Sequence, residues 1–462
     1  MAYDYDIVVI GGGPAGYAAA IRASQLKAKT LCVELDKLGG VCLNWGCIPT
    51  KALLTNAHLV ELIKNHGAAF GHSGQSTWDF AQMIRRSRGV AGQLNKGIEG
   101  LFRKYKVAWK QAKAKVVAPH KVLIGDSETV TAESIIIATG ARPRPLPGLP
   151  FDGKRVISSK EAMVLPALPQ SMLIVGAGPI GLEFAYFYNA IGTKVTVVEM
   201  QDRILPGEDE EVSAALAQSL TKRGVAIHTS AKTGQIDLGG KLVKAVIESK
   251  GGQTPVEAEV VLVAIGVMGN IEDIAAPELK LAIEKGHIKA DPAKGYLTNV
   301  PGVYAVGDVI GPPWLAHVAH HEATCCVERL LLKSTRVIDY SNIPGCTYTD
   351  PGVASVGMTE KQARDSGREV RVGKFPFAFS GRALASDETE GFVKLVFDAK
   401  YGELLGAHLI GSQATELIAE LVMAKKLEAT EEEIIHAIHP HPTYSESVME
   451  AAGQGLGESV HI

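Results

Sequence analysis

Two cysteines lie in a short glycine-rich segment that also contains a lysine. Cys42 and Cys47 are five positions apart, and Lys51 follows four positions later. On an ideal helix this spacing separates two residues by about 7.5 Å along the axis, beyond comfortable reach of a disulfide. A bridge therefore needs a distorted turn, which Gly46 permits. Because a nearby lysine stabilises a thiolate, the segment predicts a redox-active cysteine pair.

The other cysteines carry no such signal. Six cysteines among 462 residues are too few for the disulfide framework of a small secreted protein. We interpret the remaining four as buried small residues. They are Cys32, Cys325, Cys326 and Cys346.

A histidine and a glutamate near the C-terminus could move a proton. His441 precedes Glu446 by five positions in a segment with two prolines. A histidine exchanges protons near neutral pH, and a carboxylate across a turn fixes its tautomer. Alone, this pair is more typical of a structural histidine. Together with a redox cysteine pair, it predicts a general base.

Three glycines near the N-terminus have the spacing of a dinucleotide-binding turn. A short apolar run from Asp6 leads into Gly11, Gly13 and Gly16. Such glycines permit a tight turn and let a pyrophosphate approach a helix N-terminus. Glu34 ends the next apolar run, where a carboxylate can accept hydrogen bonds from a ribose diol. The segment predicts a dinucleotide site.

The same pattern recurs 165 positions later. Gly176, Gly178 and Gly181 follow a second apolar run, and Glu199 occupies the position equivalent to Glu34. A carboxylate here repels the 2′-phosphate of NADP, for which an arginine is typical. The duplication predicts two dinucleotide-binding units, and Glu199 predicts NAD for the second.

The rest of the chain indicates how these units are arranged. Ser134–Gly140 and Val260–Gly266 read as strands that close the first and second units, and proline-rich 142–150 reads as a linker. Past residue 340, a strand over 392–397 and a helix over 414–426 indicate a separate domain. We expect an α/β fold with two Rossmann-like dinucleotide-binding domains, one inserted in the other, and a C-terminal α+β domain.

Composition excludes several classes of partner. Hydrophobic residues make up 46% and charged residues 21%, with a net charge of −3. Such a chain has no basic excess to attract nucleic acid and no apolar run of about 18 residues to span a membrane. We expect no metal site and a cytoplasmic protein, or an organelle matrix protein whose targeting peptide was removed.

The motifs together resemble a known family. Gly40–Lys51, the two glycine turns, Val303–Asp308 and His441–Glu446 are similar to segments of the class I flavoprotein disulfide reductases, most closely the dihydrolipoamide dehydrogenases. The resemblance covers essentially the whole chain. It implies oxidation of protein-bound dihydrolipoyl groups to lipoyl disulfide and reduction of NAD⁺ to NADH, through the cysteine pair and FAD.

The resemblance also implies the cofactor sites. The first glycine turn and Glu34 hold the adenosine half of FAD, Asp308 contacts the flavin side, and the segment around Ala316 lies beside the ring. Lys51 is expected to pair with Glu183 near the flavin. The residues expected to contact FAD or NAD are Gly11, Gly13, Gly16, Glu34, Lys51, Asp308, Ala316, Gly176, Gly178, Gly181, Glu199 and Gly266.

By the same resemblance, the two cysteines have different roles. Cys47 is the sulfur next to the flavin, and Cys42 exchanges with the substrate. His441, oriented by Glu446, deprotonates the incoming dithiol and comes from the partner subunit of a homodimer, and we expect a cis peptide bond between His441 and Pro442. The protein partner is then a lipoyl-carrying acyltransferase core of a 2-oxoacid dehydrogenase complex, or the carrier protein of the glycine cleavage system.

The resemblance divides the chain into four domains. The expected limits are 1–145 for FAD binding, 146–270 for NAD binding, 271–340 for a central domain that completes the FAD site, and 341–462 for the dimer interface. One departure from the family lies at Gly266–Asn270, where many members have an arginine and a proline. This puts in question an arginine contact with NAD at this loop.

Four alternatives are weighed by the same residues. Glutathione-type reductases use NADPH, which Glu199 disfavours, and mercuric reductases end in a cysteine pair that this C-terminus lacks. Soluble transhydrogenases lack the redox pair. A non-catalytic flavoprotein would not need Cys42, Cys47, His441 and Glu446 together.

Overall fold

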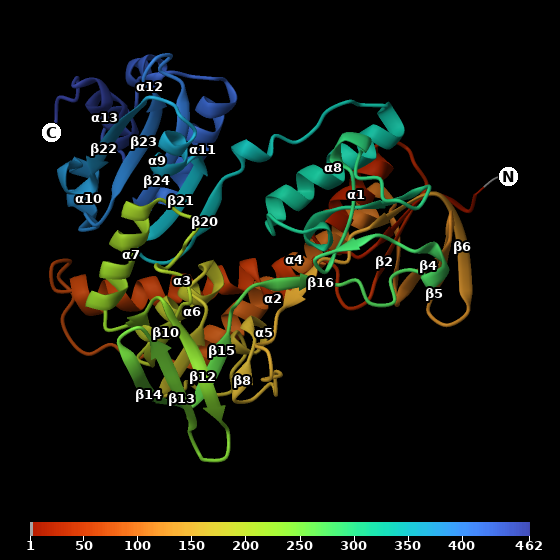
Figure 1. Ribbon diagram of the computed structural model, residues 1–462, viewed down its shortest axis with the longest axis horizontal. Helices are drawn as coiled ribbons and strands as arrows, with labels where there is room; N and C mark the ends of the chain where they lie inside the picture. The colour runs from red at the N-terminus through yellow and green to blue at the C-terminus, as the bar shows by residue number, and fades with distance from the viewer. Residues whose placement is uncertain (1–2) are drawn as a thin grey trace. The chain divides into compact units, whose positions relative to one another are not determined.

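The computed structural model describes residues 3–462 and consists of two compact units (Figure 1). The first combines residues 3–52 with Ala81–Arg144 and Gly266–Ile338. The second combines Leu53–Phe80, Pro145–Ile265 and Asp339–Ile462. The chain passes between units near residues 145, 265 and 338. The finer division into four domains stays a prediction.

The first unit is built on a mainly parallel sheet. Its parallel strands, in spatial order, are β3 (Ala108–Gln111), β2 (Thr30–Glu34), β1 (Tyr5–Ile10), β6 (Glu128–Ile137) and β19 (Val303–Ala305). Two antiparallel strands, β5 (Lys121–Ile124) and β4 (Ala114–Ala118), extend from the first part of β6. The apolar run of β1 is buried on both faces, as expected for a parallel strand covered on both sides.

Different elements cover the two faces of this sheet. Ile7 and Val9 of β1 pack in one core with residues of α1 (Pro14–Gln25) and α8 (Ala316–Leu332). Val8 of β1 belongs to a second core with residues of β4 and β5. Alternate side chains of one strand therefore serve two cores.

A long helical insertion separates β2 from β3. It consists of α2 (Gly40–Trp45), α3 (Cys47–Glu61), the π-helix η1 (Leu62–His66) and α4 (Phe80–Tyr105). Both predicted redox cysteines lie at the start of this insertion, before Leu53, in the part that belongs to the first unit.

The second unit contains the repeated nucleotide-binding motif. Its parallel sheet has the order β11 (Ala226–His228), β10 (Lys194–Val198), β9 (Ser171–Val175), β15 (Val260–Val263) and β8 (Val156–Ile157). An antiparallel sheet of β12 (Ala231–Asp237), β13 (Val243–Ser249) and β14 (Gly252–Ala258) accompanies it. The helices are α5 (Ser159–Ala162), α6 (Pro179–Ala190) and α7 (Glu210–Lys222).

The C-terminal part of the second unit is an antiparallel sheet with helices, shown in blue in Figure 1. The strand order is β20 (Gly345–Thr347), β21 (Gly352–Gly357), β24 (Leu404–Gly411), β23 (Phe392–Asp398) and β22 (Val370–Pro376). Its helices are α9 (Glu360–Asp365), α10 (Gly381–Ser386), α11 (Ala414–Lys426), α12 (Glu431–His436) and α13 (Glu446–Leu456). The predicted strand and helix are confirmed here as β23 and α11.

Two short strands join the ends of the inserted segment. β7 (Ala141–Pro143) pairs antiparallel with β16 (Val267–Gly269), so the chain leaves and re-enters the first unit at one place. Arg142 on β7 donates to the Gly269 carbonyl at 3.0 Å and to the Asn270 side chain at 3.1 Å. The predicted fold class, with one nucleotide-binding domain inserted in the other, is confirmed. Within residues 3–462, no helix is both long and apolar enough to cross a membrane.

Candidate functional site

The first glycine turn is closed by backbone contacts that exclude a side chain. Gly11 has a φ of +108°, and a Cβ there would lie 2.2 Å from the Ala138 carbonyl oxygen. A Cβ on Gly16 would lie 1.8 Å from the Gly11 carbonyl oxygen. α1 then begins at Pro14 with Gly13 as a cap that contributes no side chain. Its first N–H groups are suited to a phosphate.

Glu34 is fixed next to this turn. Its Oε2 accepts from the Gly12 N–H at 2.5 Å, and its Oε1 accepts from the Asp36 N–H at 2.8 Å. The carboxylate keeps further acceptor capacity, since each oxygen has a second lone pair. These residues fit the adenosine half of a dinucleotide.

The second turn repeats this geometry. Gly176 has a φ of +105°, and a Cβ there would lie 2.5 Å from the Ala264 carbonyl oxygen. Glu199 Oε2 accepts from the Ala177 N–H at 2.8 Å, and its Oε1 accepts from the Gln201 N–H at 2.8 Å. Gly178 caps α6 without a side chain, as Gly13 caps α1. This turn also fits a dinucleotide.

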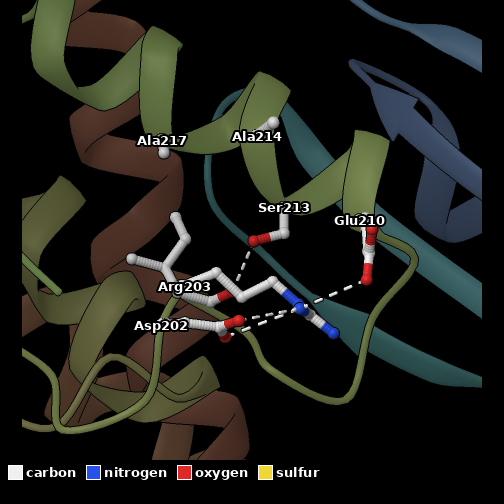
Figure 2. Close-up of a pocket in the computed structure, with 7 residues that line it drawn as sticks. Asp202, Arg203, Glu210, Ser213, Ala214 and Ala217 are labelled. Atoms are coloured by element: carbon white, nitrogen blue, oxygen red, sulfur yellow. Dashed lines mark hydrogen bonds and ion pairs between the residues drawn. The ribbon is translucent and has the colours of Figure 1, made fainter. Parts of the chain in front are cut away.

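Arg203, four positions after Glu199, lies in a small hollow between α7 and the loop that follows β10. Arg203 pairs there with Glu210 at 3.4 Å and with Asp202 at 3.5 Å, and Ser213 donates to the Ile204 carbonyl at 2.6 Å (Figure 2). Arg203 is therefore held by two carboxylates.

The cysteine pair lies where a helix is interrupted. α2 ends at Trp45, Gly46 has a φ of −153° and a ψ of −114°, and α3 begins at Cys47. The distorted turn predicted at Gly46 is present. Cys42 forms a side-chain hydrogen bond with Cys47, and both are free thiols. The break in the helix therefore brings together two sulfurs that a regular helix would separate.

Two effects act on the thiol of Cys42. The pKa of Cys42 is raised, first because its thiol donates a hydrogen bond to Cys47 and then because it is buried. The charge of Lys51 lowers the pKa of Cys42, as predicted, but the hydrogen bond and burial outweigh this effect. The hydrogen bond and the burial both favour the protonated form of the Cys42 thiol.

Several residues that sequence reasoning missed support the cysteine segment. The buried Asn44 donates to the carbonyls of Leu38 and Gly40, each at 3.0 Å. From α4, Arg88 donates to the Asn44 carbonyl at 2.6 Å and lies over the Trp45 ring. No local feature of the sequence pointed to this contact, because Arg88 is 44 positions from Asn44.

The expected flavin side contains a carboxylate without a hydrogen bond. Asp308 follows β19, and its side chain makes no hydrogen bond or ion pair with another residue in the described range 3–462. Burial raises its pKa to about 6. Hydroxyl groups of a bound FAD would satisfy such a carboxylate. Ala316 is the first residue of α8, which also lacks a side-chain cap.

A second pair of side chains lies close to the cysteines. The Tyr17 hydroxyl is 2.8 Å from His320 Nε2, and their rings meet edge to face. Burial, with the charges of Cys42 and Cys47, raises the pKa of Tyr17 to about 12. Neither residue was singled out from the sequence.

His441 and Glu446 form the expected pair. His441 Nδ1 lies 2.8 Å from Glu446 Oε1, and the Thr443 N–H donates to Glu446 Oε2 at 2.7 Å. Burial opposes ionisation of Glu446, but the Thr443 N–H and His441 bring its pKa below the usual range. The side chain of His441 is 80% exposed. The predicted cis bond between His441 and Pro442 is confirmed.

The remaining site residues are placed as follows. Glu183 is buried in α6, where it accepts from the Tyr348 N–H at 3.1 Å. Lys51 belongs to the first unit and Glu183 to the second, so their pairing stays a prediction. Gly266 has a φ of +107° and open space where a Cβ would be.

The other four cysteines were predicted to be buried. Cys32, Cys325 and Cys326 are buried, so the prediction is confirmed for them. It is wrong for Cys346, which is only half-buried because its thiol hydrogen-bonds Tyr348 near the surface.

Comparisons with known proteins agree with this geometry. Residues 5–323 match the family described as pyridine nucleotide-disulphide oxidoreductase, and residues 343–452 match its dimerisation domain. The chain is 45% identical to dihydrolipoyl dehydrogenase of Rhizobium etli over 99% of both chains. It is 41% identical to the mitochondrial dihydrolipoyl dehydrogenase of Pisum sativum, over 99% of this chain and 92% of that protein.

A solved structure also matches. The crystal structure of LpdA from Mycobacterium tuberculosis superposes with a TM-score of 0.88 at 26% identity, over 96% of this chain and 98% of that chain. With two glycine turns, a paired dithiol and a matching C-terminal domain, the chain belongs to the pyridine nucleotide-disulphide oxidoreductase family, which uses FAD and NAD.

Proposed function

We propose that the chain oxidises protein-bound dihydrolipoyl groups to lipoyl disulfide and reduces NAD⁺ to NADH. The observation that carries this proposal is the contact between the Cys42 and Cys47 thiols at the helix break. The names of the Rhizobium etli and pea relatives supply the substrate class. The duplicated glycine turns supply the two nucleotide sites.

The sulfur chemistry is a thiol–disulfide exchange. In the oxidised enzyme, a substrate thiolate attacks the Cys42 sulfur of the Cys42–Cys47 disulfide, and Cys47 leaves as a thiolate. The second substrate thiol then displaces Cys42 from the mixed disulfide, so the lipoyl disulfide leaves and a dithiol remains. A bound FAD, which the first glycine turn and Glu34 would hold, would supply the two-electron redox chemistry between this dithiol and NAD⁺. The preference of Cys42 for its proton supports Cys42 as the exchanging sulfur and Cys47 as the thiolate.

The proton from the substrate needs an acceptor. We assign this role to His441, whose Nδ1 is held by Glu446 so that Nε2 is left to receive a proton. The strong exposure of His441 in the single chain and the dimerisation domain support a site completed by His441 of the partner subunit. The enzyme is then a homodimer with two composite sites.

The physiological substrate is the lipoyl group of a larger protein. We propose the acyltransferase core of a 2-oxoacid dehydrogenase complex or the carrier protein of the glycine cleavage system. Pull-down from the native source, with identification of the lipoylated protein, tests this assignment. Capture of no lipoylated protein would contradict it.

The experiment that tests the sulfur assignment compares two variants by absorbance from neutral to alkaline pH. Cys42→Ser leaves the Cys47 thiolate beside the flavin and should show a long-wavelength band without reductant. Cys47→Ser removes the donor and should stay plain yellow. Both should lose turnover of dihydrolipoamide. A band in Cys47→Ser alone would reverse the roles, and no band in either would mean that neither sulfur lies against the flavin.

A further inference from the structure

An acidic turn between α10 and β23 faces basic side chains from distant parts of the second unit. Asp387 Oδ2 lies 2.6 Å from His66 Nδ1, and Glu390 Oε2 lies 3.3 Å from Arg223. Glu388 lies between them and faces His58 of α3. Two of these three basic partners are histidines.

Glu388 differs from its neighbours because it has two partners. Its Oε1 is 3.8 Å from His58 Nε2, and its Oε2 accepts from the Tyr444 hydroxyl at 3.2 Å. The Glu388 side chain is 22% exposed, so these interactions are only partly screened by water. Glu388 therefore connects α3 with the loop that contains His441.

His58 lies between two carboxylates. Its Nδ1 is within hydrogen-bond distance of Asp350 Oδ2, at 3.1 Å, while its Nε2 is 3.8 Å from Glu388 Oε1. The contact with Asp350 is therefore a hydrogen bond, and the contact with Glu388 is electrostatic. The pKa of His58 is raised by the hydrogen bond to Asp350, against burial, and by the charges of Asp350, Glu388 and Glu61.

Tyr444 is anchored more firmly than the histidine three positions before it. Its ring is 7% exposed and packs edge to face on Phe377, with centroids 5.6 Å apart. Burial raises the pKa of Tyr444, and its hydroxyl donates to Glu388 and also forms a hydrogen bond with Ser386. The same loop is fixed at its other end by the hydrogen bonds of Glu446.

We propose that Glu388 is a positioning residue for the dithiol half-reaction: through Tyr444 it holds the loop that presents His441, and through His58 it ties that loop to α3. α3 is the helix that begins at Cys47. The proposal rests on the proposed role of His441 as the base, which serves the site of the partner subunit. Glu388 thereby links two elements of the same subunit: the helix that begins at Cys47 of its own dithiol, and the loop whose His441 serves the dithiol of the partner subunit.

The test measures reduction of the FAD-loaded dimer by dihydrolipoamide in single-turnover experiments. Tyr444→Phe keeps the packed ring and removes the donor, and we expect a rate about 5-fold lower, the effect of one charge-assisted hydrogen bond. Glu388→Ala should lower the rate at least as much. The double variant should be no slower than Glu388→Ala, because Glu388→Ala already removes the hydrogen bond from Tyr444 to Glu388.

Two comparisons separate positioning from general damage. Glu388→Gln retains an acceptor for Tyr444 and should restore the rate to within about 2-fold of the unchanged protein. The matched control is Glu390→Gln in the same turn, which weakens the ion pair with Arg223; within residues 3–462, Tyr444 donates to Glu388 and not to Glu390, so the rate should be unchanged. NADH-driven dye reduction, which does not need His441, should be unchanged in all variants.

Two outcomes overturn the inference. One is an unchanged dithiol rate in Tyr444→Phe, and the other is an equal loss in Glu390→Gln. If Glu388→Ala loses its flavin or its dimeric state, Tyr444→Phe and Glu388→Gln decide the question alone. His441→Gln is measured beside them: if it retains full dithiol reduction, the proposed role of the base fails, whereas a large loss there with no effect of Tyr444→Phe rejects only the present inference.

Discussion

The two glycine turns of this chain repeat each other down to single hydrogen bonds. Gly11 and Gly176 have φ values of +108° and +105°. In both turns a glutamate at the end of the next strand accepts from a backbone N–H of the turn and from the N–H two positions after itself. The local sequence therefore encodes the same geometry twice.

What surrounds the two turns is different. In the first unit, a Cβ on Gly40 would lie 2.6 Å from the Gly13 Cα, so the start of the helix with Cys42 is pressed against the turn. In the second unit, nothing lies within 4 Å of a Cβ on Gly178. The cause is the insertion of α2, α3 and α4 between β2 and β3, where the second unit has only α7 between β10 and β11. The helical insertion therefore places the redox cysteines beside the first nucleotide turn, and the second turn has no such insertion.

We expect the largest effect on cofactor binding when a side chain is added to the glycines of the two turns. Gly11→Ala and Gly176→Ala each place a methyl group against a carbonyl oxygen at a positive φ, so the backbone must move. We expect Gly11→Ala to be purified without FAD, and Gly176→Ala to keep FAD but to lose at least about 100-fold in kcat/KM for NAD⁺. Flavin absorbance and steady-state kinetics are the measurements. Equal loss of flavin in both variants would remove the functional distinction between the turns.

The two glutamates should differ in the nucleotide that they select. Glu199→Ala removes the charge that repels a 2′-phosphate, and the loss of charged hydrogen bonds to the ribose costs about 2 kcal/mol. We expect the preference for NAD⁺ over NADP⁺ to fall from orders of magnitude to about 10-fold. Glu34→Ala is the matched control and should weaken retention of FAD without changing this preference. Comparable kcat/KM for the two nucleotides in the unchanged protein would contradict the assignment.

The contact between the first turn and α2 has no counterpart in the second unit. Gly40→Ala meets the Gly13 backbone at a φ of +55°, and we expect a loss of about 2 kcal/mol in the free energy of unfolding. Gly178→Ala should change the stability of the nucleotide-free protein by less than about 0.5 kcal/mol. Urea unfolding of both variants tests the difference. Equal stability of the two would mean that the contact is not tight in solution.

Asp308 lies in the first unit, and its raised pKa should make the free energy of unfolding depend on pH. Burial raises its pKa from 3.8 to about 6, so the folded chain binds its proton more tightly than the unfolded chain. This contribution lowers stability as pH rises from about 4 to 6 and stays constant above. Asp308→Asn should therefore stabilise the flavin-free protein by about 2 kcal/mol at pH 8, allowing for partial exposure, and have little effect at about pH 4. Urea unfolding at both pH values is the measurement, and an equal gain at both would exclude titration of Asp308 as the cause.

Much of the site follows from sequence because its signals are local. The positive φ of Gly11 and Gly176, the break at Gly46 and the pairing of His441 with Glu446 each involve residues within a few positions of one another. The support from Arg88 was not predicted, because an arginine on a long helix has no local feature that names its acceptor. The half-buried Cys346 was misread for the same reason.

The sequence by itself determined the two nucleotide turns, the distance between them, the cysteine pair and the histidine loop, because backbone dihedrals and strand or helix periods are set by neighbouring residues. Only the tertiary structure decided that Tyr17 meets His320, 303 positions away, and that Glu388 joins His58 to Tyr444. Such contacts depend on how sheets and helices from distant segments pack. The fold determines which polar side chains meet, and the amino-acid sequence alone does not show which distant residues will be in contact.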